Sequence, residues 1–91
     1  MRYSYDPKKR VANLKKHGLD FDDAHLVIES ESAVTFEDHR YGYDEQRFIT
    51  LGMLGERVVP TVTAETDEEI RVIPMREADR NEQEIYYTNR R

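Results

Sequence analysis

Two β-rich runs separated by only two residues are the feature that most constrains the fold. Residues 47–54 and 57–65 are rich in strand-forming residues, and the Gly55-Glu56 pair between them is typical of a hairpin turn. Strands joined by so short a turn are antiparallel, because parallel neighbours need a long crossover. Residues 33–36 and 69–75 have the composition of two further strands. We therefore expect a four-stranded antiparallel sheet.

Two prolines and one polar stretch modify this expectation. Pro60 and Pro74 each lack a backbone donor, so we expect each to lie at a sheet edge, a bulge or a strand end. Residues 37–45 are polar and contain a glycine, which predicts a mobile loop between the first expected strand and the hairpin.

Helix signals precede and follow the expected sheet. Asp6-Pro7 is a typical helix start and Gly18 a typical stop. Val11 and Leu14, three residues apart, are expected to form the apolar face of this helix.

A second and a third helix are also expected. Asp20, an N-cap candidate with the acidic Asp23 three residues later, predicts a short helix that ends near Ile28. Residues 76–87 have the pattern of a last helix. The expected fold class is α+β, with two N-terminal helices, a four-stranded antiparallel sheet and a C-terminal helix, the helices packing on one sheet face. At 91 residues the chain is expected to form one domain, residues 1–91.

Charge is distributed unevenly along the chain. The formal net charge is −5, which argues against a protein that coats nucleic acid through bulk electrostatics. Residues 1–19, however, contain six Lys and Arg against one acidic residue, whereas residues 20–45 contain nine acidic residues against one Arg. The sequence therefore predicts a dipolar surface, unless both segments serve only as solvated faces.

Cysteine is absent, which excludes disulfides, thiolate metal sites and a cysteine nucleophile and fits a cytoplasmic location. No apolar run approaches the roughly 20 residues that span a bilayer. No pair of histidines has zinc-ligand spacing, so neither a metal nor any other cofactor is expected.

Three blocks of sequence resemble the BrnT family of toxins. The blocks comprise Asp6, Lys9, Asn13, Lys16-His17-Gly18-Leu19, Phe21 and Ala24; then Arg47-Phe48-Ile49, Leu51-Gly52, Gly55 and Arg57-Val58-Val59; then Arg71–Arg76, Ala78, Glu82 and Tyr86. Two positions depart from the family pattern: Tyr5 replaces an aromatic that is often Trp, and Pro74 replaces a residue that is commonly Ser. The resemblance implies a RelE-like fold, ribonuclease activity as a toxin, and neutralisation by a BrnA-type antitoxin that also binds operator DNA.

RNA cleavage without a metal requires proton transfer and stabilisation of charge on the phosphate. His17 is the acid–base candidate, because histidine has an unperturbed pKa of about 6.5; the alternative is that it caps the helix C-terminus. Lys9 and Lys16 lie two helical turns apart, so that one helix face can present both to RNA, although surface lysines commonly only solvate.

Arg57, Arg71 and Arg76 are candidate phosphate contacts, because a guanidinium binds phosphate through two parallel hydrogen bonds. Cross-strand pairing with carboxylates is the alternative for Arg57 and Arg71. Arg76 is expected to open the last helix, where a cation opposes the helix dipole, which favours a functional role. Glu82, at a position where the resemblance implies a carboxylate, is a candidate general base or an ordinary solvated residue. The nuclease hypothesis requires these cations and the imidazole to converge in one hollow.

Two other functions remain open. Pro74 and the acidic excess favour a catalytically inactive module that binds an antitoxin or acts as a co-repressor. A DNA-binding domain is the third possibility, because the first expected helix carries Asn13 and a lysine cluster.

Overall fold

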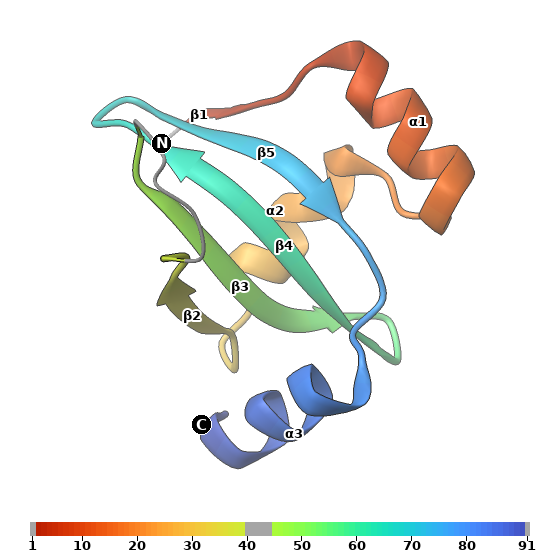
Figure 1. The fold of residues 1–91 in the computed structure, drawn as a ribbon, viewed down its shortest axis with the longest axis vertical. Coiled ribbons are helices and arrows are strands. Elements are labelled where there is room, and N and C mark those ends of the chain that lie inside the picture. The colour runs from red at the N-terminus through yellow and green to blue at the C-terminus, as the bar shows by residue number, and fades with distance from the viewer. Residues whose placement is uncertain (1, 40–44, 91) are drawn as a thin grey trace.

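A computed structural model describes residues 2–39 and 45–90 (Figure 1). In chain order the elements are β1 (Arg2–Ser4), α1 (Pro7–His17), the 3₁₀ turn η1 (Phe21–Asp23), α2 (Ala24–Ile28), β2 (Val34–Glu37), β3 (Arg47–Leu54), β4 (Arg57–Glu65), β5 (Glu69–Met75) and α3 (Arg80–Asn89). The five strands form one mixed sheet in the order β1-β5-β4-β3-β2. The α+β class is confirmed.

The hairpin and the strand that follows it are confirmed with the expected bounds, and β2 agrees within one residue. Gly55 has φ 64°, a left-handed conformation that suits glycine in the tight turn between β3 and β4. The centre of the expected loop, residues 40–44, lies outside the described residues.

The four expected strands are present and antiparallel to one another, but the sheet contains a further strand that the sequence did not predict. β1 adds a fifth strand, which pairs in parallel with the first part of β5 through Arg2↔Glu69, Tyr3↔Ile70 and Ser4↔Arg71. Three residues are too few to show a periodic pattern, and their partner strand lies far away in sequence, so local signals do not reveal this pairing.

Both prolines lie where the missing donor is tolerated. Thr61 pairs with Met75 and Thr63 with Val72, so β5 has one extra residue between them, and Pro74 lies within this bulge. The Pro60 carbonyl accepts a hydrogen bond from the Arg76 amide, just beyond the end of β5. The expectation for Pro74 is therefore confirmed, whereas Pro60 lies inside β4, paired with Leu51 of β3, next to the point where the pairing of β4 with β5 ends at Thr61↔Met75.

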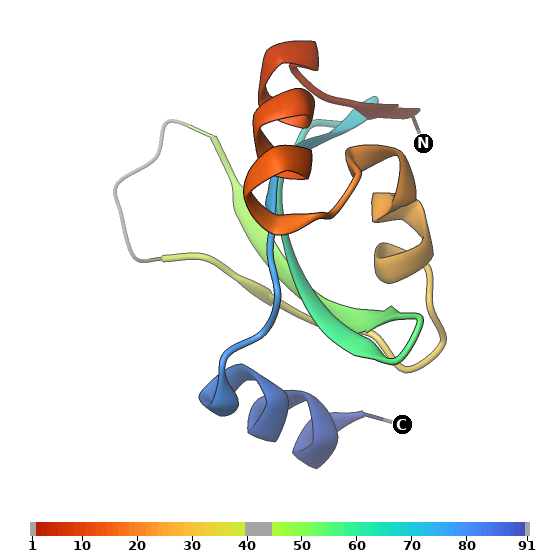
Figure 2. The same cartoon turned by 90° about the vertical axis from the view of Figure 1, so that its right-hand side faces the viewer.

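The helices cover both faces of the sheet, which corrects the expectation of one covered face. Val59 and Val72 pack with Phe21 and Val27 of the η1–α2 segment in one core cluster. Val58, the neighbour of Val59, packs in a second cluster with other strand residues and with Tyr86 of α3. Because successive strand residues point to opposite faces, α2 and α3 lie on opposite faces. Figure 2 shows α1 and α2 beside the upper part of the sheet and α3 at its lower end.

The bounds of α1 are confirmed, but its packing face is not the expected one. Asp6 caps the first turn by accepting from the Lys8 amide, and Gly18, with φ 69°, ends the helix. Val11 and Leu14, expected on the packed face, are 53% and 44% exposed. The only buried residue of α1 is the polar Asn13.

The second helical segment begins and ends as expected. Asp20 caps η1 by accepting from the Asp22 amide, and α2 continues to Ile28. Arg10 of α1 binds the Asp20 carboxylate through two hydrogen bonds of 2.8 and 2.9 Å. This ion pair connects α1 to η1 and lowers the pKa of Asp20 to about 2, chiefly through the hydrogen bond from Arg10.

The last helix begins at Arg80, so the expectation that Arg76 opens it was wrong. The Arg76 and Ala78 amides donate instead to the carbonyls of Pro60 and Val58, which keeps the chain beside β4. Asp79 and Glu82 then form a reciprocal capping box at the true start of α3. The argument that placed Arg76 against a helix dipole therefore no longer applies.

Candidate functional site

Lys9, Lys16 and His17 come together in a hollow between α1 and β5. The hollow encloses about 240 Å³, and Ile73 and Pro74 of the β5 bulge form its opposite wall. Lysine and histidine side chains over a hollow of this size are suited to bind a small anion or one phosphate of a longer chain.

Asn13 positions α1 beside β5. Because β1 pairs only with Glu69–Arg71, the later part of β5 has no strand on this side. There the Asn13 side-chain oxygen accepts from the Met75 amide at 3.2 Å, and its amide nitrogen donates to the Leu19 carbonyl at 3.0 Å. A buried asparagine thus takes the place of a neighbouring strand and holds α1 against β5.

The cations of this hollow are not neutralised by carboxylates of the described residues. Lys9 and Lys16 form no ion pair with any of those residues, and the half-buried His17 ring makes no hydrogen bond with any of them. The Leu14 carbonyl at the helix end accepts from the Gly18 amide. The alternative role considered for His17 was to cap the C-terminus of α1. Within the described part of the chain its ring makes no such hydrogen bond, so it does not cap the helix in this way.

Arg71 lies on the neighbouring part of β5, next to a second arginine. Val72 packs in the α2-side core, so Arg71 and Ile73 point to the other sheet face. Arg71 forms an ion pair with Glu45, and the same carboxylate lies 3.6 Å from a guanidinium nitrogen of Arg47. Arg47 and Arg71 both pair with Ala64, one on each side of β4. Glu45 thus bridges two arginines.

Arg76 and Glu82 are paired with each other. Both terminal nitrogens of Arg76 donate to the Glu82 carboxylate at 2.7 Å, and the Asp79 amide donates to it at 3.1 Å. The Glu82 side chain is only 12% exposed. Three hydrogen bonds therefore stabilise its charged form and join Arg76 to the first turn of α3.

Arg57 lies in a different hollow from His17. It lines a space of about 220 Å³ between the β3–β4 turn and α3, together with Glu56, Glu77 and Tyr87. The expected convergence of all candidate cations with the imidazole is therefore wrong: Lys9, Lys16 and His17 share one hollow, whereas Arg57, Arg71 and the Arg76–Glu82 pair lie outside it.

Sequence reasoning did not single out Arg47 and Glu45. Arg47 opens the first strand of the hairpin and belongs to the second block of the family resemblance. Its position on the strand was therefore predictable, whereas the shared carboxylate depends on the path of the chain before β3.

Two general findings concern metals and membranes. Within residues 2–39 and 45–90, no three His, Cys, Asp or Glu side chains are grouped so that they could hold a metal ion. None of the helices in those ranges has the length and apolar character needed to cross a bilayer.

Comparison with known proteins identifies a family. The family model described as "Ribonuclease toxin, BrnT, of type II toxin-antitoxin system" matches residues 5–82, which is most of the chain and includes all seven candidate residues. No curated protein matches the chain significantly.

Proposed function

Because the chain belongs to the BrnT family of ribonuclease toxins from type II toxin–antitoxin systems, we propose that the hollow of Lys9, Lys16 and His17 is its RNA-cleaving site. One observation carries this choice. A half-buried imidazole without a hydrogen-bonding partner among the described residues lies in one hollow with two lysines that none of those residues neutralises. The arginine candidates Arg71 and Arg76, by contrast, already bind carboxylates.

The proposed reaction is metal-independent attack of the 2′-hydroxyl on the adjacent phosphorus. The bond from phosphorus to O5′ breaks, which leaves a 2′,3′-cyclic phosphate and a free 5′-hydroxyl. His17 either takes the proton from the 2′-oxygen or gives one to the departing O5′, because imidazole exchanges protons near neutral pH, and solvent water exchanges the other proton. Lys9 and Lys16 stabilise the negative charge that gathers on the phosphate oxygens.

We give the remaining candidates roles along a longer RNA chain. Arg71, next to the hollow on β5, and Arg57 contact neighbouring phosphates. Arg76 is a further phosphate contact that Glu82 holds in place through their two hydrogen bonds. If Glu82 were instead the general base, Arg76 would first have to release it.

Further features follow from family membership and remain proposals. Toxins of type II systems act with a protein antitoxin, and we propose that this partner is of the BrnA type and that the chain meets operator DNA only through it. We also propose a single RelE-like toxin domain, residues 1–91, that acts in the cytoplasm.

The test is RNA cleavage by the purified chain with EDTA present. We expect the wild type to cut RNA and a substrate with a 2′-deoxy sugar at the cut position to resist cleavage. His17→Ala should lower kcat by roughly a hundredfold or more, the usual contribution of a general acid or base. Glu82→Gln keeps a residue suited to the capping box and should lower kcat less than tenfold, because the carboxamide oxygen can still accept from one Arg76 nitrogen and from the Asp79 amide, and only the second bond to Arg76 is lost.

Three results would contradict this function. Equal loss in Glu82→Gln and His17→Ala would move the base to Glu82. Activity that EDTA abolishes would refute the metal-free chemistry. A wild-type chain that neither cuts RNA nor arrests growth, yet binds its antitoxin, would favour the inactive-module alternative.

A further inference from the structure

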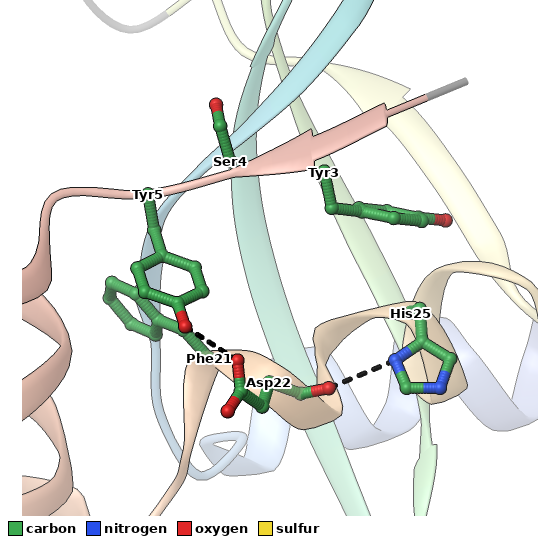
Figure 3. A pocket seen from close by; sticks show the side chains of 6 residues that line it. All are labelled: Tyr3, Ser4, Tyr5, Phe21, Asp22 and His25. Atoms are coloured by element: carbon green, nitrogen blue, oxygen red, sulfur yellow. Dashed lines mark hydrogen bonds between the residues drawn. The ribbon is translucent and has the colours of Figure 1, made fainter.

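A second hollow lies between β1 and the η1–α2 segment. It encloses about 390 Å³, and its walls include Tyr3, Tyr5, Phe21, Asp22 and His25 (Figure 3). It shares no lining residue with the hollow of Lys9, Lys16 and His17. Sequence reasoning could not find it, because β1, which forms one wall, was not predicted.

Alternation along β1 turns two tyrosines toward this hollow. In Figure 3 the side chains of Tyr3 and Tyr5 point toward η1 and α2, and that of Ser4 points away. Each phenol binds a carboxylate at 2.6 Å: Tyr5 donates to Asp22, and Tyr3 donates to Glu29. Asp22 lines the hollow and Glu29 is held beside it by the Tyr3 phenol, so the hollow has two similar halves, each bordered by one tyrosine that binds a carboxylate.

A guanidinium from this chain already lies beside the Tyr5 half. The Arg10 guanidinium lies 5.9 Å from the centre of the Tyr5 ring and 3.1 Å from the Asp22 carboxylate. An aromatic face and a carboxylate together favour an arginine, which interacts with the ring and binds the acid at once. This half shows what kind of group the arrangement accepts.

The Tyr3 half also has a tyrosine ring and a carboxylate bound by its hydroxyl, but no cation corresponds to Arg10 there among the described residues. No Lys or Arg of the described residues forms an ion pair with Glu29. The His25 ring lies 6.3 Å from the Tyr3 ring, which adds a second aromatic wall. Burial, followed by the hydrogen bond to Glu29, raises the pKa of Tyr3 to about 12, so its phenol remains a donor at physiological pH.

The charge around this hollow favours the binding of a positively charged side chain and opposes the binding of RNA. Residues 20–32 contain five acidic residues and no Lys or Arg, so a phosphate backbone would be repelled here.

We propose that the Tyr3 half of this hollow receives a basic side chain of the antitoxin, with an arginine fitting best. Its guanidinium lies against the Tyr3 and His25 rings and binds the Glu29 carboxylate, as Arg10 does with Tyr5 and Asp22. This inference rests on the proposed function only in taking the partner to be an antitoxin.

The test compares two charge-neutralising variants only two residues apart in the sequence. Glu29→Gln removes the charge that the Tyr3 phenol binds beside the hollow but keeps the shape and an acceptor for Tyr3, whereas Glu31→Gln makes the same change at another exposed residue, which makes no hydrogen bond with a lining residue. Calorimetry with the purified antitoxin from the same operon gives the dissociation constant. We expect Glu29→Gln to weaken binding by roughly tenfold or more and Glu31→Gln to leave it within about twofold.

A double-mutant cycle identifies the antitoxin side chain that binds in the hollow. Each Lys and Arg of the antitoxin is replaced by Ala in combination with wild-type toxin and with Glu29→Gln. One of these antitoxin replacements should weaken binding to the wild-type toxin but should weaken binding to the Glu29→Gln toxin little further. Equal dissociation constants for Glu29→Gln and Glu31→Gln, or no antitoxin cation coupled to Glu29, would overturn the proposal.

RNA cleavage separates this inference from the proposed function. Glu29→Gln should cut RNA as fast as the wild type, because Glu29 does not line the Lys9–Lys16–His17 hollow. Slower cleavage by Glu29→Gln with unchanged antitoxin binding would make the hollow an RNA contact and refute the inference. A wild-type chain without nuclease activity would refute the proposed function alone, because the antitoxin dissociation constants do not depend on cleavage.

Discussion

Asn13 shows how a single polar residue can decide the position of a helix. The sequence pattern favoured Val11 and Leu14 as the packed residues of α1, yet both are largely exposed and Asn13 is buried. The reason lies in β5, whose Met75 amide has no strand partner on that side and needs an acceptor. That requirement arises from the parallel pairing of β1, which the local sequence does not reveal.

Replacing Asn13 should destabilise the fold. Asn13→Ala leaves the Met75 amide and the Leu19 carbonyl without their buried partner, and we expect a loss of about 2 kcal/mol in the free energy of unfolding. Urea denaturation followed by circular dichroism measures it. Asn89→Ala removes an exposed asparagine that bonds the Ile85 carbonyl and should cost less than about 0.5 kcal/mol. Equal effects of the two substitutions would show that Asn13 does not fix α1.

At the scale of elements, the Arg10–Asp20 pair makes the contact between α1 and η1 dependent on pH. The folded pKa of Asp20, about 2, lies below the ordinary value of 3.8 for this carboxyl. The ionised carboxylate therefore stabilises the fold fully above about pH 4, and this contribution is lost as the pH falls from 4 toward 2.

Asp20→Asn tests this dependence while keeping a good N-cap residue. We expect the variant to be less stable than the wild type at pH 6 and the difference to shrink steadily below pH 4, as followed by thermal unfolding at several pH values. A stability difference that stayed constant down to pH 2 would mean that the ion pair does not account for the effect.

Two glycines report on different features of β3 and its turn. A Cβ added at Gly52 would lie 2.5 Å from the Val27 carbonyl oxygen of α2, so Gly52→Ala must push α2 away from the sheet. We expect a loss of roughly 3 kcal/mol in the free energy of unfolding. Gly55 has open space around it but φ 64°, so Gly55→Ala should cost only about 1 kcal/mol. Chemical denaturation measures the free energy of unfolding of both variants. A larger loss of that free energy for Gly55→Ala than for Gly52→Ala would contradict the close packing of α2 on β3.

The sequence predicted the elements whose signals are local. The bounds of β3, β4 and β5 and both ends of α1 follow from composition, turn glycine and capping residues within a few positions. β1 was missed because its pairing with β5 is not local. The start of α3 was misplaced because the 76–79 segment is held extended by hydrogen bonds to Pro60 and Val58, which no pattern in that segment indicates.

At the scale of the whole molecule, charge separates the two surfaces that we propose to be functional. The basic α1 contributes its lysines and His17 to one hollow, while the acidic segment of residues 20–32 borders the other. An overall negative chain can therefore still bind RNA, provided that binding is confined to the α1 hollow, and can present an acidic surface to a basic partner.

The composition of the candidate site was only partly predictable. Lys9, Lys16 and His17 share one helix, so their proximity follows from helical spacing. Arg57, Arg71 and Arg76 lie on or after strands, and their places depend on register, on the β5 bulge and on which carboxylates come near. Sequence identifies such arginines but cannot say that Glu45 and Glu82 bind two of them.

The measurement that tests the central claim most directly is the salt dependence of RNA binding by two matched double variants. The double variant Lys9→Ala/Lys16→Ala removes both lysines that line the hollow. The double variant Lys8→Ala/Lys15→Ala removes the same charge from the same helix, at positions that do not line the hollow. Binding of a 2′-O-methyl oligonucleotide, which cannot be cleaved, is followed by fluorescence anisotropy over a range of salt concentrations. If both lysines contact phosphates, the slope of log K against log salt should fall by about 1.4 in the first variant and remain unchanged in the second. Equal slopes for the two variants would contradict the assignment of this hollow as the RNA site.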